Sequence, residues 1–342
     1  MNFLAVDAFI EQTIAEGLIP GAVIGVANKE GILYQKAYGQ SFPAQQINMT
    51  TDTLFDVASL TKVVATTPAI LYCLERGLLD LDDTVGYYFP QFQNNYPEVT
   101  LKHLLTHTSG WRAFYPFHIE QTIHTDILDT IANLPAEAPL GSAVIYSDLN
   151  FIVLGKVVEH VTKKPLDLFC TQELYQPLRM HTTRFTPNGN PPLPVAPTEL
   201  QADGTYTWGV VHDENARYFG GVSGHAGLFS SVKDVLRFGQ LWLRGGESFF
   251  RPATVHMATT CYTPFLNEAR AIGFETYSEG KYSGQYLKDG FGHTGFTGTS
   301  LWVSPKENVV VVILTNRVHF RRHHNIARFR RIVHNLTALA LR

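Results

Sequence analysis

Ser59-Leu60-Thr61-Lys62 directly follows the apolar stretch of residues 54–58 and places a hydroxyl and an amine three residues apart. If this segment is helical, both side chains project from the same face, with Cβ atoms about 5–6 Å apart. A serine hydroxyl alone is a weak nucleophile, and a neighbouring lysine is one of the groups that activate it. A serine that opens a helix also has a free backbone N–H for a developing oxyanion. The segment therefore predicts that Ser59 is a nucleophile and Lys62 its activating amine.

The same spacing occurs a second time in the chain, at Ser278 and Lys281, where Gly280 and Gly284 favour a turn. A four-residue pattern with two free positions thus arises by chance, and an ordinary helix cap followed by an exposed lysine also explains it. Companion motifs elsewhere in the chain have to decide between the two readings.

The composition predicts a globular protein of two lobes. The 342 residues exceed the length of about 250–300 at which single cores stop growing. Apolar residues make up 45% and charged residues 17%, and the net charge of −3 argues against nucleic acid as a partner. The first twenty residues lack the basic start of a signal peptide, and no apolar run is long enough for a membrane span. The three cysteines are scattered and form no disulfide framework. We expect a cytoplasmic protein, unless a leader has been removed.

Both ends of the chain carry the patterns of one antiparallel sheet that is covered by helices. Two pairs of β-rich runs each flank a short turn, and an apolar stripe at helical spacing lies outside each pair. The predicted strands are residues 22–27, 32–38, 297–303 and 309–314, and the predicted helices are residues 3–17 and 326–339.

The middle of the chain is richer in helical patterns and loops, with helices expected at residues 101–105, 123–134 and 150–161. Residues 187–204 contain five prolines and predict a long surface loop. Pro68 lies inside the nucleophile helix, where a straight helix would cost about 3 kcal/mol, so we expect a kink beyond Lys62. The predicted fold class is α/β (α+β), with a discontinuous sheet lobe of residues 1–58 and 220–342 and a mostly helical lobe of residues 59–219.

Two further motifs accompany the serine and the lysine. Tyr146-Ser147-Asp148 precedes a helical run, and His293-Thr294-Gly295-Phe296 opens a predicted strand. In this order and spacing the chain resembles the penicillin-recognising serine hydrolases, the branch of class C β-lactamases, D-alanyl-D-alanine carboxypeptidases, penicillin-binding-protein-like proteins and β-lactamase-fold esterases. The resemblance runs from about residue 10 to residue 320 and includes residues 104–110 and 221–228. It implies a β-lactamase/transpeptidase-like fold, no cofactor and no metal.

The resemblance also implies the roles of three catalytic residues. Ser59 is the acylated nucleophile, Lys62 holds and relays its proton, and Tyr146 is the third member. A phenol normally titrates at about pH 10, but an adjacent ammonium favours the phenolate. We therefore expect Tyr146 to take the serine proton and later to activate water.

The strand motif matches the Lys-Thr-Gly of the family, and the resemblance makes His293, Thr294, Gly295 and Phe296 substrate-binding residues. Gly295 lets the substrate backbone approach, and the Phe296 N–H is the second oxyanion donor. The histidine is a departure, because it is mostly neutral at pH 7 where a lysine is always charged. Binding of a substrate carboxylate is expected to be weaker or more dependent on pH.

Asp148 is the second departure and the fifth predicted substrate-binding residue. The usual Tyr-x-Asn of the family offers an amide that donates and accepts, whereas an ionised aspartate only accepts. We expect Asp148 either to hold Lys62 as a cation or to bind a substrate amine. Both departures lower the expected efficiency of β-lactam hydrolysis.

Three other signals are weaker. His103 and His107 have the spacing of a zinc pair but lack the glutamate and the third ligand of such a site. The polar run 212–215 is either a substrate-contacting rim or a solvated turn, and the arginines of residues 317–331 are expected on the outer face of a docked helix rather than on a nucleic-acid surface.

We therefore expect acyl transfer to Ser59 and then to water, on a small ester, amide or β-lactam, as in an esterase or a D-Ala-type peptidase. The alternative is a penicillin-binding or sensor module that is acylated but does not hydrolyse its adduct. A true β-lactamase is the least favoured of the three, and the sequence does not predict the oligomeric state.

Overall fold

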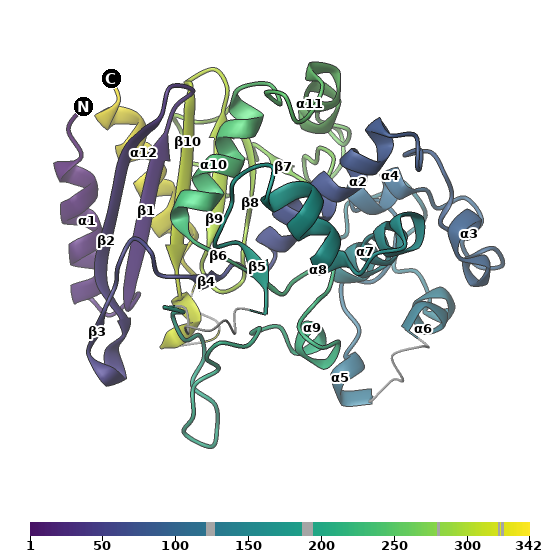
Figure 1. Ribbon diagram of the computed structural model, residues 1–342, viewed down its shortest axis with the longest axis horizontal. Coiled ribbons are helices and arrows are strands. Elements are labelled where there is room, and N and C mark those ends of the chain that lie inside the picture. Colours follow the sequence, from purple (N-terminus) through teal and green to yellow (C-terminus); the bar gives the residue numbers. More distant parts are fainter. Residues whose placement is uncertain (121–126, 187–193, 279–280, 321, 323–324) are drawn as a thin grey trace.

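A seven-stranded antiparallel sheet, in the order β3-β2-β1-β10-β9-β8-β7, forms one side of the molecule (Figure 1). The computed structural model describes residues 1–342 apart from residues 121–126, 187–193, 279–280, 321 and 323–324. The central pair joins strands from opposite ends of the chain, from Ala22 beside Thr315 to Ala27 beside Val310. The strands are β1 (Gly21–Ala27), β2 (Ile32–Phe42), β3 (Ile47–Asn48), β7 (Glu275–Thr276), β8 (Phe291–Thr294), β9 (Ser300–Ser304) and β10 (Val309–Thr315).

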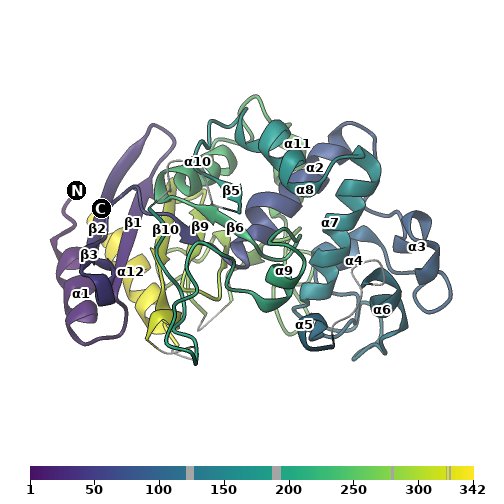
Figure 2. The same cartoon turned by 60° about the horizontal axis from the view of Figure 1, so that its bottom comes forward.

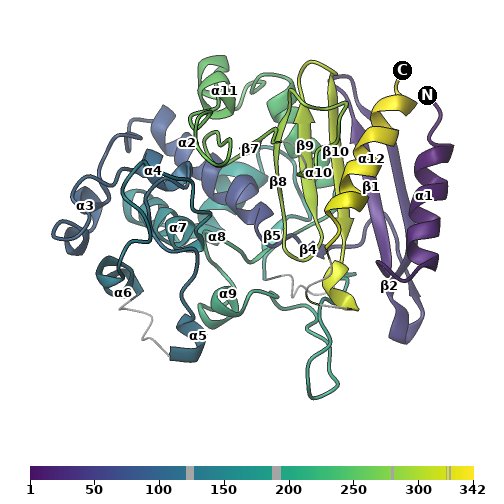
Figure 3. The same ribbon diagram turned by 180° about the vertical axis from the view of Figure 1, so that it is seen from behind.

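Helices cover both faces of this sheet. The first and last helices of the chain, α1 (Leu4–Ala15) and α12 (Ala327–Ala340), lie side by side on one face (Figure 3). Helix α10 (Val232–Leu243) covers the other face, where it contacts β1, β9 and β10. Gly25 permits its close approach, because a Cβ at that position would lie 2.6 Å from a methyl group of Val232. Both faces are therefore buried, and β1 and β10 are apolar at nearly every position.

The sequence predictions for the two ends of the chain are confirmed in type, with two differences in position. The hairpin of β1 and β2, the pair of β9 and β10 and both flanking helices are present. However, the predicted strand at residues 297–303 begins only at Ser300. The His293 motif does not open a strand but ends one, since β8 stops at Thr294 and a turn leads to β9. The motif thus lies at the edge of the sheet layer, where side chains reach a pocket.

Helices and loops make up the other side of the molecule (Figure 2). Residues 101–105 are helical as predicted, residues 150–161 lie within α7, and the first part of the predicted helix 123–134 falls outside the described residues. None of the described helices is long and apolar enough to cross a membrane. The helices are α2 (Thr67–Glu75), α3 (Val85–Tyr88), α4 (Leu101–Leu105), α5 (Phe117–Glu120), α6 (Ile127–Asn133), α7 (Asp148–Thr162), α8 (Leu166–Phe169), α9 (Glu214–Tyr218) and α11 (Pro252–Thr259).

A small second sheet, in the order β4-β6-β5, brings together three distant parts of the chain. Its strands are β4 (Phe55–Asp56), β5 (Arg184–Phe185) and β6 (Leu228–Ser230). Strand β4 leads directly to Ser59, so this sheet fixes the approach to the nucleophile. The boundaries of the two predicted lobes remain a prediction.

The helix that contains Lys62 adapts to Pro68 by widening. Residues Lys62–Thr66 form a π-helical turn, η2, in which the N–H of Thr67 donates to the carbonyl of Lys62. Helix α2 then starts at Thr67, so that Pro68 occupies its first turn, where a missing N–H costs little. The irregularity expected from Pro68 is therefore present, as a π-turn between Lys62 and the proline.

Candidate active site

Ser59 is partly exposed and follows a strained residue. Ala58 has φ of +48°, a left-handed conformation that is unfavourable for a residue with a Cβ. The carboxylate of Asp56 stabilises it by accepting the Ala58 N–H at 2.8 Å. The Val57 N–H donates to the carbonyl of Leu228 at 3.0 Å, which ties this segment to β6. The chain around Ser59 is thus held in a fixed conformation at the start of its helix.

Lys62 is fully buried and has three acceptors for its three N–H bonds. Its Nζ lies 3.0 Å from Ser59 Oγ, 3.1 Å from the carbonyl oxygen of His225 and 2.7 Å from Asp148 Oδ1. Burial alone would lower the pKa of Lys62, but Asp148, followed by Tyr146, outweighs burial and the net shift is upward. The ammonium form is therefore the resting form, and Asp148 holds it. This is the first of the two arrangements expected for Asp148.

Tyr146 lies beside the lysine and the serine. The Lys62 Nζ is 4.8 Å from the centre of the phenol ring, and the buried hydroxyl faces Lys62 and Ser59. Burial raises the pKa of Tyr146, and Lys62 and Ser59, which lower it, do not outweigh burial and Asp148. The ammonium favours the phenolate, as expected from the sequence, but burial and Asp148 outweigh it in the resting protein. The phenol is neutral until a proton leaves the site.

His293 is buried, and a backbone contact fixes its tautomer. Its Nδ1 lies 2.8 Å from the carbonyl oxygen of Thr294, so Nδ1 carries the proton and donates it. Burial lowers the pKa of His293 well below its usual value, and the charges of Arg270 and Lys62 lower it further. His293 thus stays neutral at physiological pH and adds no positive charge for a carboxylate. The expected dependence of carboxylate binding on the titration of this residue does not hold near neutral pH.

The turn after His293 is tied to the segment that carries the nucleophile. The hydroxyls of Thr297 and Thr299 donate to the carbonyls of Asp56 and Val57, at 2.7 and 3.0 Å. Gly295 is required here, because a Cβ would lie 2.1 Å from the Thr299 hydroxyl and 2.3 Å from the Val57 carbonyl oxygen. The two segments are therefore in close contact at Gly295.

Two backbone N–H groups are available beside the serine. Neither the Ser59 nor the Phe296 N–H has an acceptor among the residues that the structure describes. Ser59 and Phe296 both line the same pocket. This pair is the arrangement that the sequence predicts for two oxyanion donors.

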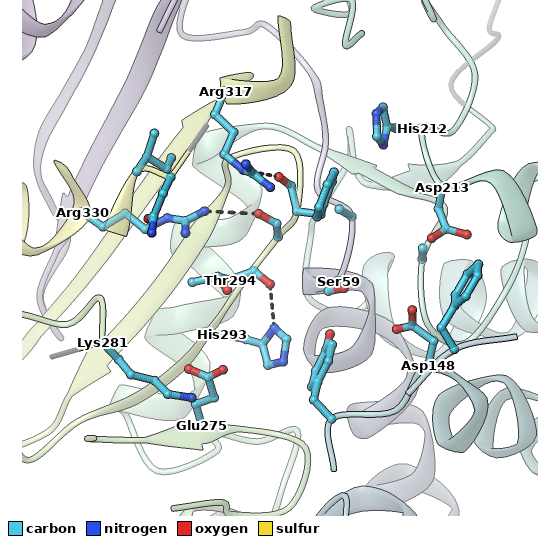
Figure 4. A pocket seen from close by; sticks show the side chains of 18 of the residues that line it. Ser59, Asp148, His212, Asp213, Glu275, Lys281, His293, Thr294, Arg317 and Arg330 are labelled. Carbon is cyan, nitrogen blue, oxygen red and sulfur yellow. Dashed lines mark hydrogen bonds between the residues drawn. The ribbon is translucent and has the colours of Figure 1, made fainter. Parts of the chain in front are cut away.

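The pocket at Ser59 has a volume of about 670 Å³ and is lined by side chains of both charges. Asp148 and Asp213 lie on one side of Ser59, whereas Arg317 and Arg330 lie on the other, beyond Thr294 (Figure 4). The other charged or titratable side chains that line the pocket are Tyr146, His212, Glu214, Glu268, Arg270, Glu275, Lys281, His293 and Arg322. A pocket of this size takes a small polar molecule.

Asp213, His225 and Asp148 form the one group of acidic and histidine side chains close enough to hold a metal ion within the described chain. Asp213 accepts from His225 Nε2 at 2.9 Å, and His225 outweighs burial and holds the pKa of Asp213 below its usual range. The Lys62 ammonium already supplies a positive charge at Asp148. His103 and His107 do not form a pair, since His103 caps the start of α4 with Thr100 while His107 lies past its end and accepts the Ser147 N–H.

Sequence reasoning left two alternatives open for residues 212–215, and it did not find the buried positions of Arg330 and Arg270. Of the polar run 212–215, His212, Asp213 and Glu214 line the pocket, which fits the rim rather than a solvated turn. Arg330 is not on the outer face of α12 but is buried and donates to the carbonyls of Gly295 and Thr299, at 3.2 and 3.0 Å. Arg270 is buried behind Tyr146. The sequence did contain a signal for Arg330. It follows Phe329 at a position where the apolar stripe of the helix continues, and this position predicts a side chain that faces inward.

Comparison with known proteins agrees with this fold. A family model described as Beta-lactamase matches residues 6–335. A relative from Escherichia coli O157:H7, provisionally named D-alanyl-D-alanine carboxypeptidase, is 33% identical over 92% of this chain and 82% of its own. An N-acetylmuramyl-L-alanine amidase from Bacillus subtilis (strain 168) is 31% identical over 92% of this chain and 80% of its own. The octameric penicillin-binding protein homologue from Pyrococcus abyssi has the same fold, with a TM-score of 0.79, 22% identity, and coverage of 100% of this chain and 77% of that chain.

The fold and the family match define an enzyme, a serine hydrolase. The chain belongs to the β-lactamase family, which confirms the resemblance and the fold class predicted from the sequence.

Proposed function

We propose that the protein hydrolyses a small ester or amide through an acyl-enzyme on Ser59, with Lys62 and Tyr146 as its catalytic partners. The observation that carries this proposal is the contact of 3.0 Å between Lys62 Nζ and Ser59 Oγ at the floor of a pocket of about 670 Å³. Nucleophile and amine within hydrogen-bond distance are the signature of an activated serine.

Acylation requires one proton to leave the pair of Lys62 and Tyr146 first, because both are protonated in the resting site. We assign the loss to Tyr146, since Lys62 has three acceptors that keep it an ammonium. Ser59 Oγ then attacks the substrate carbonyl carbon while its proton passes to the phenolate oxygen. The oxyanion accepts from the N–H groups of Ser59 and Phe296. As the bond to the leaving group breaks, Tyr146 returns the proton to the departing amine or alcohol.

Hydrolysis of the adduct repeats these steps with water. Water attacks the ester carbon and gives its proton to Tyr146, and Ser59 Oγ leaves and takes that proton back. Because the pKa of Tyr146 is raised, little of the protein carries the phenolate base near neutral pH. This observation favours the second candidate function, a slow-turnover penicillin-binding or sensor module, over an efficient β-lactamase.

The substrate class follows from the pocket and the relatives. The relatives named above are a carboxypeptidase and an amidase by name, so a peptide-like amide is one candidate. The guanidinium groups of Arg317 and Arg330 lie beyond Thr294, where they favour a substrate with an anionic group on that side. On the other side, Asp148 and Asp213 are already paired with Lys62 and His225.

Steady-state assays separate the two functions. Short-chain p-nitrophenyl esters and a fluorescent penicillin are incubated with the wild-type protein and with Ser59→Ala. Continuous ester turnover that is lost in Ser59→Ala supports the hydrolase, and a single stable penicillin adduct supports the sensor module. Unchanged turnover by Ser59→Ala contradicts both.

A further inference from the structure

Tyr146 needs positive charge in its surroundings to act as a base. Its phenol is buried, and both burial and Asp148 oppose loss of the proton. Lys62 is one cation beside the ring, at 4.8 Å from its centre. However, the carboxylate of Asp148 lies 2.7 Å from the same ammonium and offsets its charge.

Position 293 does not supply a second cation. The centre of the His293 ring lies 5.7 Å from that of Tyr146, so a lysine there would lie close to the phenol. The imidazole carries its single proton on Nδ1 and donates it to the carbonyl of Thr294. His293 is thus a neutral neighbour of the phenol.

Arg270 is a second cation in contact with the ring. Its guanidinium carbon lies 5.3 Å from the centre of the Tyr146 ring, within the range of a cation–π contact. The residue is only 1% exposed, and a guanidinium stays protonated even when it is buried. Glu275, at 3.2 Å, and Glu268 hold the Nη2 end of the guanidinium, while Nε and Nη1 have no hydrogen-bond partner within the described chain. The aromatic ring and the carboxylates therefore fix the position of this charge.

We propose that Arg270 is a positioning residue for Tyr146, and that it supplies beside the phenol ring the fixed positive charge that the neutral His293 does not provide. This inference rests on the proposed function, in which Tyr146 is the base. The guanidinium favours the phenolate because it lies against the ring, and the favourable contact strengthens as the ring gains negative charge. A lysine at position 293 and an arginine at position 270 are thus two ways to meet the same electrostatic need.

The other charged groups near Tyr146 set the size of the effect. Glu268 and Glu275 offset Arg270, and Lys281 pairs with Glu268 at 2.7 Å, so the cluster holds two cations and two carboxylates. Of these four side chains, only Arg270 contacts the phenol ring. The remaining titratable groups around the phenol are Lys62, Asp148, His107 and His293.

The test is the pH dependence of kcat/KM for a neutral p-nitrophenyl ester in a double-mutant cycle. Arg270→Met is expected to move the rising limb of the profile upward by about one pH unit and to lower the rate near neutral pH about tenfold. Arg270→Lys, which keeps the charge, is expected to retain most of the wild-type profile. In the Arg270→Met background, His293→Lys is expected to return the rising limb to its wild-type pH. When Arg270 is present, the same substitution is expected to move the limb little. A merely structural role for Arg270 would not be rescued by an amine at position 293.

Two further variants keep each outcome decisive. Glu275→Gln retains Arg270 but removes one of its carboxylate partners, so it is expected to move the rising limb to lower pH. This variant keeps the test possible if Arg270→Met does not fold.

Ser59→Ala separates the two proposals. If it hydrolyses the ester like the wild type, the proposed function fails. If it is inactive while Arg270→Met or Glu275→Gln leaves the limb unmoved, only the role of Arg270 is overturned. The absorbance of the Tyr146 tyrosinate can be followed against pH without substrate, and Tyr146→Phe identifies it as the signal that is lost. Its titration in each variant should shift in the same direction as the rising limb.

Discussion

The two walls of the pocket hold their charges in different ways. On the helical side, the buried Lys62 and the partly exposed Asp148 form an ion pair of 2.7 Å directly beside the serine. On the sheet side, Arg330 is buried against the backbone carbonyls of Gly295 and Thr299 and has no carboxylate partner among the described residues. Burial accordingly lowers the pKa of Arg330 to about 10. The ion pair with Asp148 keeps Lys62 protonated beside the serine, so we assign the chemical step to the helical wall. The buried Arg330, without a carboxylate partner in the described part of the chain, attracts an anionic group, so we assign substrate recognition to the sheet wall.

Lys62→Met should have the largest effect, because it removes the amine from the reactive wall. We expect the rate of acylation by a fluorescent penicillin to fall about a thousandfold or more. Binding of the unreacted ligand should change little, and rapid-quench kinetics separates the two. Lys233→Met, on the exposed side of α10, is the matched control. Acylation at the wild-type rate in Lys62→Met would contradict the assignment.

Tyr146→Phe keeps the ring and removes the hydroxyl to which we assign proton transfer. General acid–base catalysis is worth about 10²–10⁴-fold, so both acylation and release of the adduct should slow by that order. The ring contacts with Lys62 and His107 remain, so the thermal unfolding midpoint should stay close to that of the wild type. An unchanged kcat for ester hydrolysis would show that another group moves the proton.

Asp148→Asn alters the reactive wall without removing a proposed base. The carboxylate raises the pKa of both Lys62 and Tyr146, so its loss lowers both. A base that loses its proton more easily is active at lower pH, and the rising limb of the profile of kcat/KM against pH should move to lower pH. Near neutral pH the rate should increase about tenfold for a shift of about one unit. A limb that moves to higher pH would contradict the role assigned to the ion pair.

Arg330→Met tests the recognition wall and should affect substrate binding rather than the chemical step. A charge-assisted hydrogen bond contributes about 1.5–3 kcal/mol, so KM for an ester with a terminal carboxylate should rise about tenfold or more. The neutral ester of the same length should keep its KM. Arg328→Met, exposed on the same helix, controls for the loss of an arginine. An equal loss for both esters would mean that Arg330 supports the turn at Gly295 rather than an anion.

The sequence predicted features that depend on local patterns. The hairpin of β1 and β2, the helix α12 and the motif of Ser59 and Lys62 each follow from the spacing of nearby residues. What it did not predict depends on contacts across the fold. The buried position of Arg330 requires α12 to dock beside Gly295, and the neutral state of Tyr146 requires knowledge of its burial. Periodicity reveals which side chains face inward, but it does not reveal which distant groups they meet.

The central claim is that Ser59 carries the acyl group, and the most direct test is intact-protein and peptide mass spectrometry after reaction with a fluorescent penicillin. We expect one adduct per chain, on the peptide that contains Ser59, and no adduct in Ser59→Ala. An adduct on another residue, or an equal adduct in Ser59→Ala, would contradict it.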